Sequence, residues 1–140
     1  MKRRGYEILE HPADLGISAR GETLQEAFEE AAKGLTAIIL DPATVRPQTA
    51  LPVSITASDR EQLLVRWLSE VLYLYDGKRF PCAEFTIHEL GPTWLVATVR
   101  GEDLDASRHH TRLDVKAVTY HQLDIQEFAG QSRVRVFLDI

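Results

Sequence analysis

The feature that most constrains the fold is that only two stretches of the sequence have helical periodicity. Apolar residues recur every three or four positions over residues 24–38 and again over residues 63–75. Each stretch follows a pair of residues with capping-box spacing, in which each side chain satisfies an orphan backbone donor of the other. These pairs are Thr23 with Glu26, and Ser58 with Glu61. We therefore expect two amphipathic helices, the second ending near Gly77.

The other patterned stretches alternate between apolar and polar residues, which is typical of half-buried strands. We expect about seven strands. They lie at residues 6–9, 15–20, 53–57, 83–87, 94–100, 113–121 with a continuation through 125, and 134–140. No regular strand–helix–strand rhythm connects them, so a parallel sheet is not indicated. The sequence predicts an α+β fold of two layers, a mostly antiparallel sheet with both helices on one face, in a single domain over residues 1–140.

Composition restricts the kind of partner. A formal net charge of -5 disfavours broad nucleic-acid binding, although it leaves room for a small local basic patch or for an acidic docking face. Cys82 is the sole cysteine, which excludes an internal disulfide and a thiolate metal cluster. No apolar run approaches the length of a membrane span, and none follows the basic start as a signal peptide requires. We expect a cytoplasmic protein.

The stretch over residues 113–121 has an unusual polar side. Period two places Leu113, Val115, Ala117 and Thr119 on an expected core face. The opposite side mixes an acid, a cation, a valine and a phenol, namely Asp114, Lys116, Val118 and Tyr120. An ordinary strand whose Lys116 reaches solvent explains this pattern, and a functional lysine is the alternative.

Catalytic signatures are missing from the sequence. It contains no phosphate-binding glycine loop, no nucleophile elbow and no His-Glu-x-x-His zinc motif. The adjacent pair His109 and His110 lies in a polar stretch, where neighbouring side chains usually diverge, so a histidine-based transition-metal site is disfavoured.

Carboxylates at the two ends of the chain form the remaining constellation. Asp14 and Asp139 both lie on the non-core side of their expected strands, and Ile140 adds the terminal carboxylate. If the first and last strands are neighbours, these groups converge, and their repulsion requires a cation. Hard cations such as calcium or magnesium take oxygen ligands of this kind. Each acid can also be read as an ordinary turn-forming or solvated side chain.

Five segments in chain order resemble motifs of the archease family. Residues 11–17 resemble its His-Thr-Ala-Asp-hydrophobic-Gly motif, with Pro12 in place of threonine. The other matching segments are residues 23–32, 64–76, 100–121 (Arg-Gly-Glu and Val-Lys-Ala-Val-Thr-Tyr-His, with a variable loop between them) and 138–140. The likeness covers essentially the whole chain.

The resemblance implies a role that the residues alone do not indicate. Archeases are non-catalytic accessory proteins of the GTP-dependent tRNA-splicing RNA ligase, and they promote its guanylylation and multiple turnover. The resemblance therefore implies a protein partner, with RNA contacted only indirectly. It also implies a bound calcium ion, with magnesium or manganese as alternatives, held by Asp14, Asp139 and Ile140.

Other matching motif positions are His11, Lys116, Tyr120 and His121, which are candidates for partner activation. Two other functions stay open on the sequence alone. One is a small metal-dependent hydrolase or nuclease that uses Asp14, Asp139 and Lys116. The other is a chaperone-like module that binds apolar surfaces of client proteins.

Overall fold

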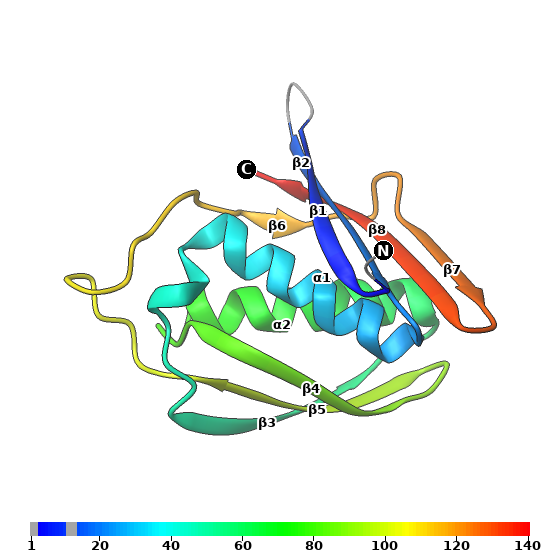
Figure 1. Ribbon diagram of the computed structural model, residues 1–140, viewed down its shortest axis with the longest axis horizontal. Coiled ribbons are helices and arrows are strands. Elements are labelled where there is room, and N and C mark those ends of the chain that lie inside the picture. Colours follow the sequence, from blue (N-terminus) through cyan, green and yellow to red (C-terminus); the bar gives the residue numbers. More distant parts are fainter. Residues whose placement is uncertain (1–2, 11–13) are drawn as a thin grey trace.

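The computed structural model describes residues 3–10 and 14–140, which form two α-helices and eight strands (Figure 1). The helices are α1 (Leu24–Ile39) and α2 (Arg60–Asp76), and a short 3-10 turn, η1 (Pro42–Thr44), follows α1. The strands are β1 (Gly5–Glu10), β2 (Asp14–Gly21), β3 (Thr49–Thr56), β4 (Cys82–Leu90), β5 (Trp94–Gly101), β6 (Ala117–Val118), β7 (Asp124–Phe128) and β8 (Gln131–Asp139). The predicted α+β class is confirmed.

The strands divide between two antiparallel sheets. The larger sheet has the order β1-β2-β8-β6, with β7 also paired to β8. Because β2 pairs with β8 along its length, β6 and β7 lie end to end along the other edge of β8. The smaller sheet has the order β3-β5-β4.

Both helices lie between the two sheets, which Figure 1 shows above and below them. Small side chains make this possible for α1, because Ala27, Ala31 and Ala32 are fully buried. At Gly34, an added Cβ would lie 2.9 Å from Cγ2 of Ile17 on β2, so the helix and the larger sheet are in close contact there. The apolar residues of α1 therefore pack against both sheets.

Trp67 of α2 is the centre of the core. Its ring is fully buried and packs edge-on against Phe85 of β4, with ring centroids 6.1 Å apart. Its indole N–H donates to the backbone carbonyl of Phe28 on α1 at 3.0 Å. This one side chain thus joins both helices to the smaller sheet, and it satisfies its own buried donor.

Helix starts follow the predicted caps, with one correction. At α1, Thr23 Oγ1 accepts from the backbone N–H of Glu26 at 3.1 Å, as the capping-box spacing predicts. At α2 the predicted Ser58 cap is wrong, because Asp59 caps the helix and accepts from the Gln62 N–H at 2.8 Å. Gly77 ends α2 as expected.

The long strand predicted over residues 113–121 is wrong. Only Ala117 and Val118 form a strand there, and Leu113 is 47% exposed rather than buried. Val115 is buried, but the next residue packed against the core is Val118 instead of Ala117. The two-residue period is therefore broken between these valines. Along the described residues, no helix is both long and apolar enough to cross a membrane.

Candidate functional site

Asp14 and Asp139 face each other across the centre of the larger sheet. They are direct register partners at the end of the β2–β8 ladder. Directly opposed residues of antiparallel strands point to the same face, with Cβ atoms about 4.5–5.5 Å apart. That face is the outer one, since the alternate residues Ile17 and Leu138 are fully buried towards the helices. The structure therefore brings the two carboxylates together as the sequence predicted.

The third predicted group follows directly along the chain. Ile140 comes immediately after Asp139, and its side chain is 39% exposed. The described residues contain no cluster of three or more His, Cys, Asp or Glu side chains arranged for a metal ion. The constellation here is thus two aspartates paired in register, with Ile140 next in the chain, and the predicted ligands are all oxygen donors.

Lys116 is brought to this pair by an irregularity in β6. Its backbone N–H donates to the carbonyl oxygen of Asp139 at 2.8 Å, while Ala117 is the register partner of the same aspartate. Two successive residues therefore oppose one, which is the arrangement of a β-bulge. Both are exposed, between buried Val115 and core-packed Val118. The bulge thus gives Lys116 an outward position beside Asp139.

Phe137 is a buried aromatic residue on the same face as the pair. It lies two residues before Asp139 on the outer side of β8, yet it is only 2% exposed. Its register partner is Gly16, where an added Cβ would lie 2.7 Å from the phenylalanine ring. The His121 ring packs against it from the β6–β7 connection, with centroids 6.0 Å apart and the rings steeply inclined. This packing of Phe137 against Gly16 and His121 was not predicted from the sequence, although a glycine within a strand often signals close approach.

The remaining predicted residues lie around this centre. His121 is exposed beyond its contact with Phe137, and its N–H donates to Thr119 Oγ1 at 3.3 Å. Tyr120 is 55% exposed at the same turn. His11 lies outside the described residues. The structure thus assembles Asp14, Asp139, Lys116 and His121 at one end of the outer face.

A second polar cluster, not identified from sequence, lies in the loop after β5. Glu102 Oε2 accepts from the backbone N–H of Arg46 and from Arg108 Nη1, each at 2.8 Å. Arg108 Nη2 binds the other carboxylate oxygen at 2.8 Å, which makes the pair bidentate. These bonds to Arg108, followed by those to Arg46 and His109, hold the pKa of Glu102 well below its usual range despite burial. This cluster is a structural support for the loop.

His109 completes that cluster in one tautomer. Its Nδ1 accepts from the backbone N–H of Asp105 at 2.9 Å, so the ring proton lies on Nε2. Nε2 then donates to Glu102 Oε2 at 2.8 Å. The imidazole is fully buried. With both ring nitrogens occupied and no solvent contact, His109 is unsuited to acid–base catalysis on an external substrate.

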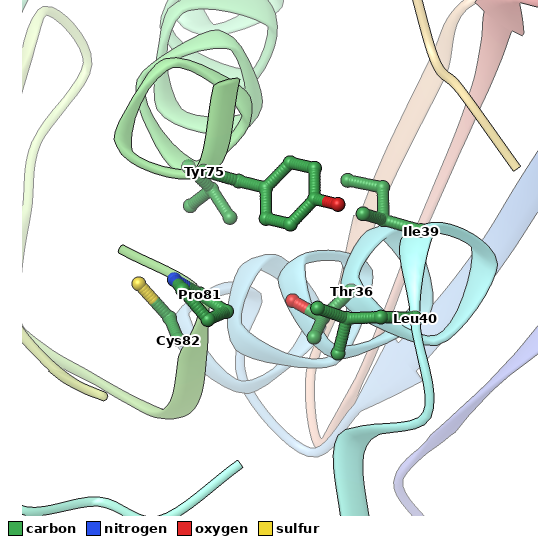
Figure 2. Close-up of a pocket in the computed structure, with 7 residues that line it drawn as sticks. Thr36, Ile39, Leu40, Tyr75, Pro81 and Cys82 are labelled. Atoms are coloured by element: carbon green, nitrogen blue, oxygen red, sulfur yellow. The ribbon is translucent and has the colours of Figure 1, made fainter. Parts of the chain in front are cut away.

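The small crevice in Figure 2 also lacks the character of an active site. It lies between the ends of α1 and α2 and the start of β4, and its volume of about 10 Å³ is near the limit for one water molecule. Burial raises the pKa of the Cys82 thiol in its wall to about 12. A thiol in this state is not a nucleophile at neutral pH.

The profile of the Archease protein family (MTH1598/TM1083) matches residues 6–140. "Protein archease" of Methanosarcina mazei is 38% identical over 139 residues, which cover 96% of this chain and 95% of that protein. "Protein archease" of Aeropyrum pernix is 35% identical over 144 residues, which cover both chains completely.

Two solved structures share the fold of this chain. The solution structure of Methanobacterium thermoautotrophicum protein 1598 superposes with a TM-score of 0.78 at 34% identity, over 97% of this chain and 99% of that one. The crystal structure of an archease from Thermotoga maritima, described as a possible chaperone, gives a TM-score of 0.60 over 96% of each chain. At 20% identity, this second likeness shows a common fold alone.

Proposed function

This chain belongs to the archease family, and from that membership we propose that it is a non-catalytic activator of the GTP-dependent tRNA-splicing RNA ligase. It would promote guanylylation and multiple turnover of that ligase during tRNA splicing and RNA repair. The observation that carries the proposal is the grouping of Asp14, Asp139 and Lys116, which are far apart in sequence, on one solvent-facing end of a sheet. All three occupy the positions that the family motifs single out.

The same group is proposed to hold a divalent cation, calcium first and magnesium or manganese as alternatives. The donor set fits, because two directly opposed carboxylates repel each other unless a positive charge offsets them. A hard cation bound to Asp14, Asp139 and the Ile140 carboxylate would supply a positive charge that attracts a phosphate oxygen. Calcium takes about six to eight oxygen ligands, so water or partner groups would complete its coordination.

Lys116 and His121 would act on the partner through their own chemistry. Lys116 is exposed, and the backbone bond to Asp139 fixes where its side chain begins. Its ammonium group offers donors to phosphate oxygens, which gain negative charge as guanylylation proceeds. His121 and Tyr120 present an imidazole and a phenol from the adjoining turn, where they can orient a partner group.

Ligase activation is tested with the purified cognate ligase and labelled GTP. A sub-stoichiometric amount of wild-type protein should raise the guanylylation rate and convert single-turnover joining to multiple turnover. Asp14→Asn and Asp139→Asn should abolish the effect, and Lys116→Ala should weaken it. The matched controls are Asp103→Asn and Lys78→Ala, which remove the same charges from exposed positions elsewhere. Equal ligase rates with and without the wild-type protein would reject the proposal.

Two assays without the ligase distinguish the other two functions. A hydrolase or nuclease would turn over RNA or nucleotide without the ligase, and Asp14→Asn would abolish that turnover. A chaperone, as the Thermotoga protein's description suggests for that protein, would protect unrelated clients from aggregation without any requirement for nucleotide.

Cation binding is tested independently by titration calorimetry. Asp14→Asn, Asp139→Asn and a C-terminal extension that removes the carboxylate from Ile140 should each weaken calcium binding at least about tenfold, because affinity follows the number of charged ligands. Asp103→Asn should leave it unchanged. Unchanged affinity in all three site variants would exclude this cation site.

A further inference from the structure

Three arginines share the outer face of the two central strands of the larger sheet. Arg20 of β2 is the direct register partner of Arg133 of β8, and Arg135 follows two residues later on the same side of β8. Their inward neighbours Ala19, Val134 and Val136 are fully buried, which fixes the arginines outward. We call Arg20, Arg133 and Arg135 the arginine face.

The fold only partly neutralises these charges. Like charges directly opposite each other in a sheet are destabilising, as Arg20 and Arg133 are. Glu7 of β1 offsets Arg20 at 3.7 Å. Arg133 has neutral Gln126 as its other cross-strand neighbour, and it makes no ion pair with any described residue. An external anion would relieve this repulsion.

Arg135 is held in place by a neutral group. Its Nε donates to the backbone carbonyl of Gln122 at 3.2 Å, in the turn that carries Tyr120 and His121. Asp124 is its register partner on β7, but their charged groups do not form an ion pair within the described part of the chain. The terminal nitrogens of a guanidinium fixed in this way can bind a phosphate as a fork.

The arginine face is continuous with the candidate site. Arg133, Arg135, Phe137 and Asp139 succeed one another along one side of β8 at steps of two residues, or about 6.8 Å each. Arg133 therefore lies about 20 Å from the aspartate pair along a single strand. His121 packs against Phe137 in this line, and the exposed Tyr120 precedes it in the chain. Both residue types have aromatic rings that can stack on a base.

We propose that the arginine face binds the phosphate backbone of a single-stranded RNA segment that runs along β8 towards Asp14 and Asp139. Identifying that RNA with the ligase's substrate rests on the proposed function. The inference departs from the sequence-based expectation that RNA is contacted only indirectly. With a formal net charge of -5, binding is confined to a few phosphates and is sensitive to salt.

The test measures RNA binding without the ligase. Fluorescence anisotropy of a labelled, unstructured RNA of about twelve nucleotides would be recorded between about 50 and 200 mM salt. Three phosphate contacts predict a slope of log affinity against log salt near about -2. The double variant Arg133→Ala, Arg135→Ala should bind about tenfold or more weakly and lose about 1.4 of that slope. The pair Arg133→Lys, Arg135→Lys should keep most of the slope.

The matched control is the double variant Arg46→Ala, Arg100→Ala. Both of its arginines are exposed and lie outside the larger sheet, and the double variant lowers the formal net charge of -5 by the same two units. It should bind RNA nearly as wild type does. Melting curves of both double variants confirm that they are folded. An equal loss in the two double variants, or no RNA binding by wild type at the lowest salt, would overturn the inference.

Three further outcomes are informative. If the arginine-face variant binds RNA normally but loses affinity for RNA-free ligase, the face docks an acidic protein surface and the RNA inference is wrong. Ligase activation by a wild-type protein that does not bind RNA would reject this inference while leaving the proposed function intact. RNA binding confined to the arginine face, without ligase activation, would support the inference and reject the proposed function.

Discussion

One missing side chain shapes the outer face next to the aspartate pair. Gly16 leaves room for the Phe137 ring, which lies on the outer side of β8 two residues from Asp139 and packs against the His121 ring. Glycine is needed there for close approach, since a Cβ would lie 2.7 Å from the ring. The packing of Phe137 on the outer face beside Asp139 therefore depends on the absence of a side chain at Gly16.

Gly16→Ala should accordingly impair the site more than the fold. The added methyl must displace the Phe137 ring, and overpacking of this kind typically costs about 1–3 kcal/mol. We expect weaker calcium binding by calorimetry and reduced ligase activation. Ser18→Ala is the control, because Ser18 is the next residue on the same side of β2. If both variants behave as wild type does, Gly16 does not position the site.

At the scale of elements, the loop between β5 and β6 is attached to the end of α1. The backbone N–H of Arg112 donates to the carbonyl of Ile39 at 2.8 Å, and its Nη1 donates to Ala37 at 2.9 Å. These bonds satisfy carbonyls at the helix C-terminus that have no intrahelical partner. Since α1 has no basic residue in its own last turn, the loop supplies one. The loop in turn leads into the bulge at Lys116.

The Glu102 cluster should make the stability of this loop depend on pH. The pKa of folded Glu102 lies below its ordinary value of 4.5, chiefly because of Arg108. The unfolded chain therefore takes up the proton first as the pH falls. This contribution to stability is complete well above pH 4.5 and is lost progressively below it.

Thermal melts between about pH 3 and pH 7 check this expectation. Glu102→Gln should be less stable than wild type at neutral pH, and it should lose less stability on acidification below pH 4.5. Glu61→Gln, at an exposed position of α2 outside the cluster, should follow the wild-type profile. Parallel profiles for wild type and Glu102→Gln would show that the cluster does not contribute to acid sensitivity.

In the whole molecule, the candidate site and the core are separate. The core lies between the sheets around Trp67 and Leu68, both fully buried, whereas Asp139 and Lys116 are exposed on the outer face. The helices therefore stabilise the sheet from one side and leave the other side available to a partner (Figure 1). Loss of function and loss of stability should be separable by mutation.

Leu68→Ala and Asp14→Ala provide that comparison. Truncation of the buried leucine should cost about 2–5 kcal/mol of unfolding free energy in denaturant titrations. Asp14→Ala should cost much less and yet abolish ligase activation. A comparable loss of stability in the two variants would mean that Asp14 is chiefly structural.

Local patterns in the sequence determined most of the elements. Helical periodicity predicted α1 and α2, the Thr23 capping pair predicted the start of α1, and alternation predicted β2, β5 and β8. These signals arise from neighbours within a few residues. The convergence of Asp14 and Asp139 was expected on the condition that the first and last strands are neighbours. In the structure Asp14 belongs to the second strand, β2, and it is β2 rather than β1 that pairs with β8 and brings the two residues together. The resemblance to the family motifs then identified Lys116 and His121 as candidate site residues.

Tertiary structure alone decided the remainder. The second sheet arises because α1 has small residues on two sides, and its apolar pattern does not tell one covering sheet from two. The bulge at Lys116 interrupts the two-residue period, which explains why Val118 packs against the core in place of Ala117. Leu113 is exposed because the chain has not yet entered the strand there. Phe137 is buried on the outer face because Gly16 and His121, distant in sequence, meet there. Each of these features depends on contacts between remote segments, which sequence periodicity cannot encode.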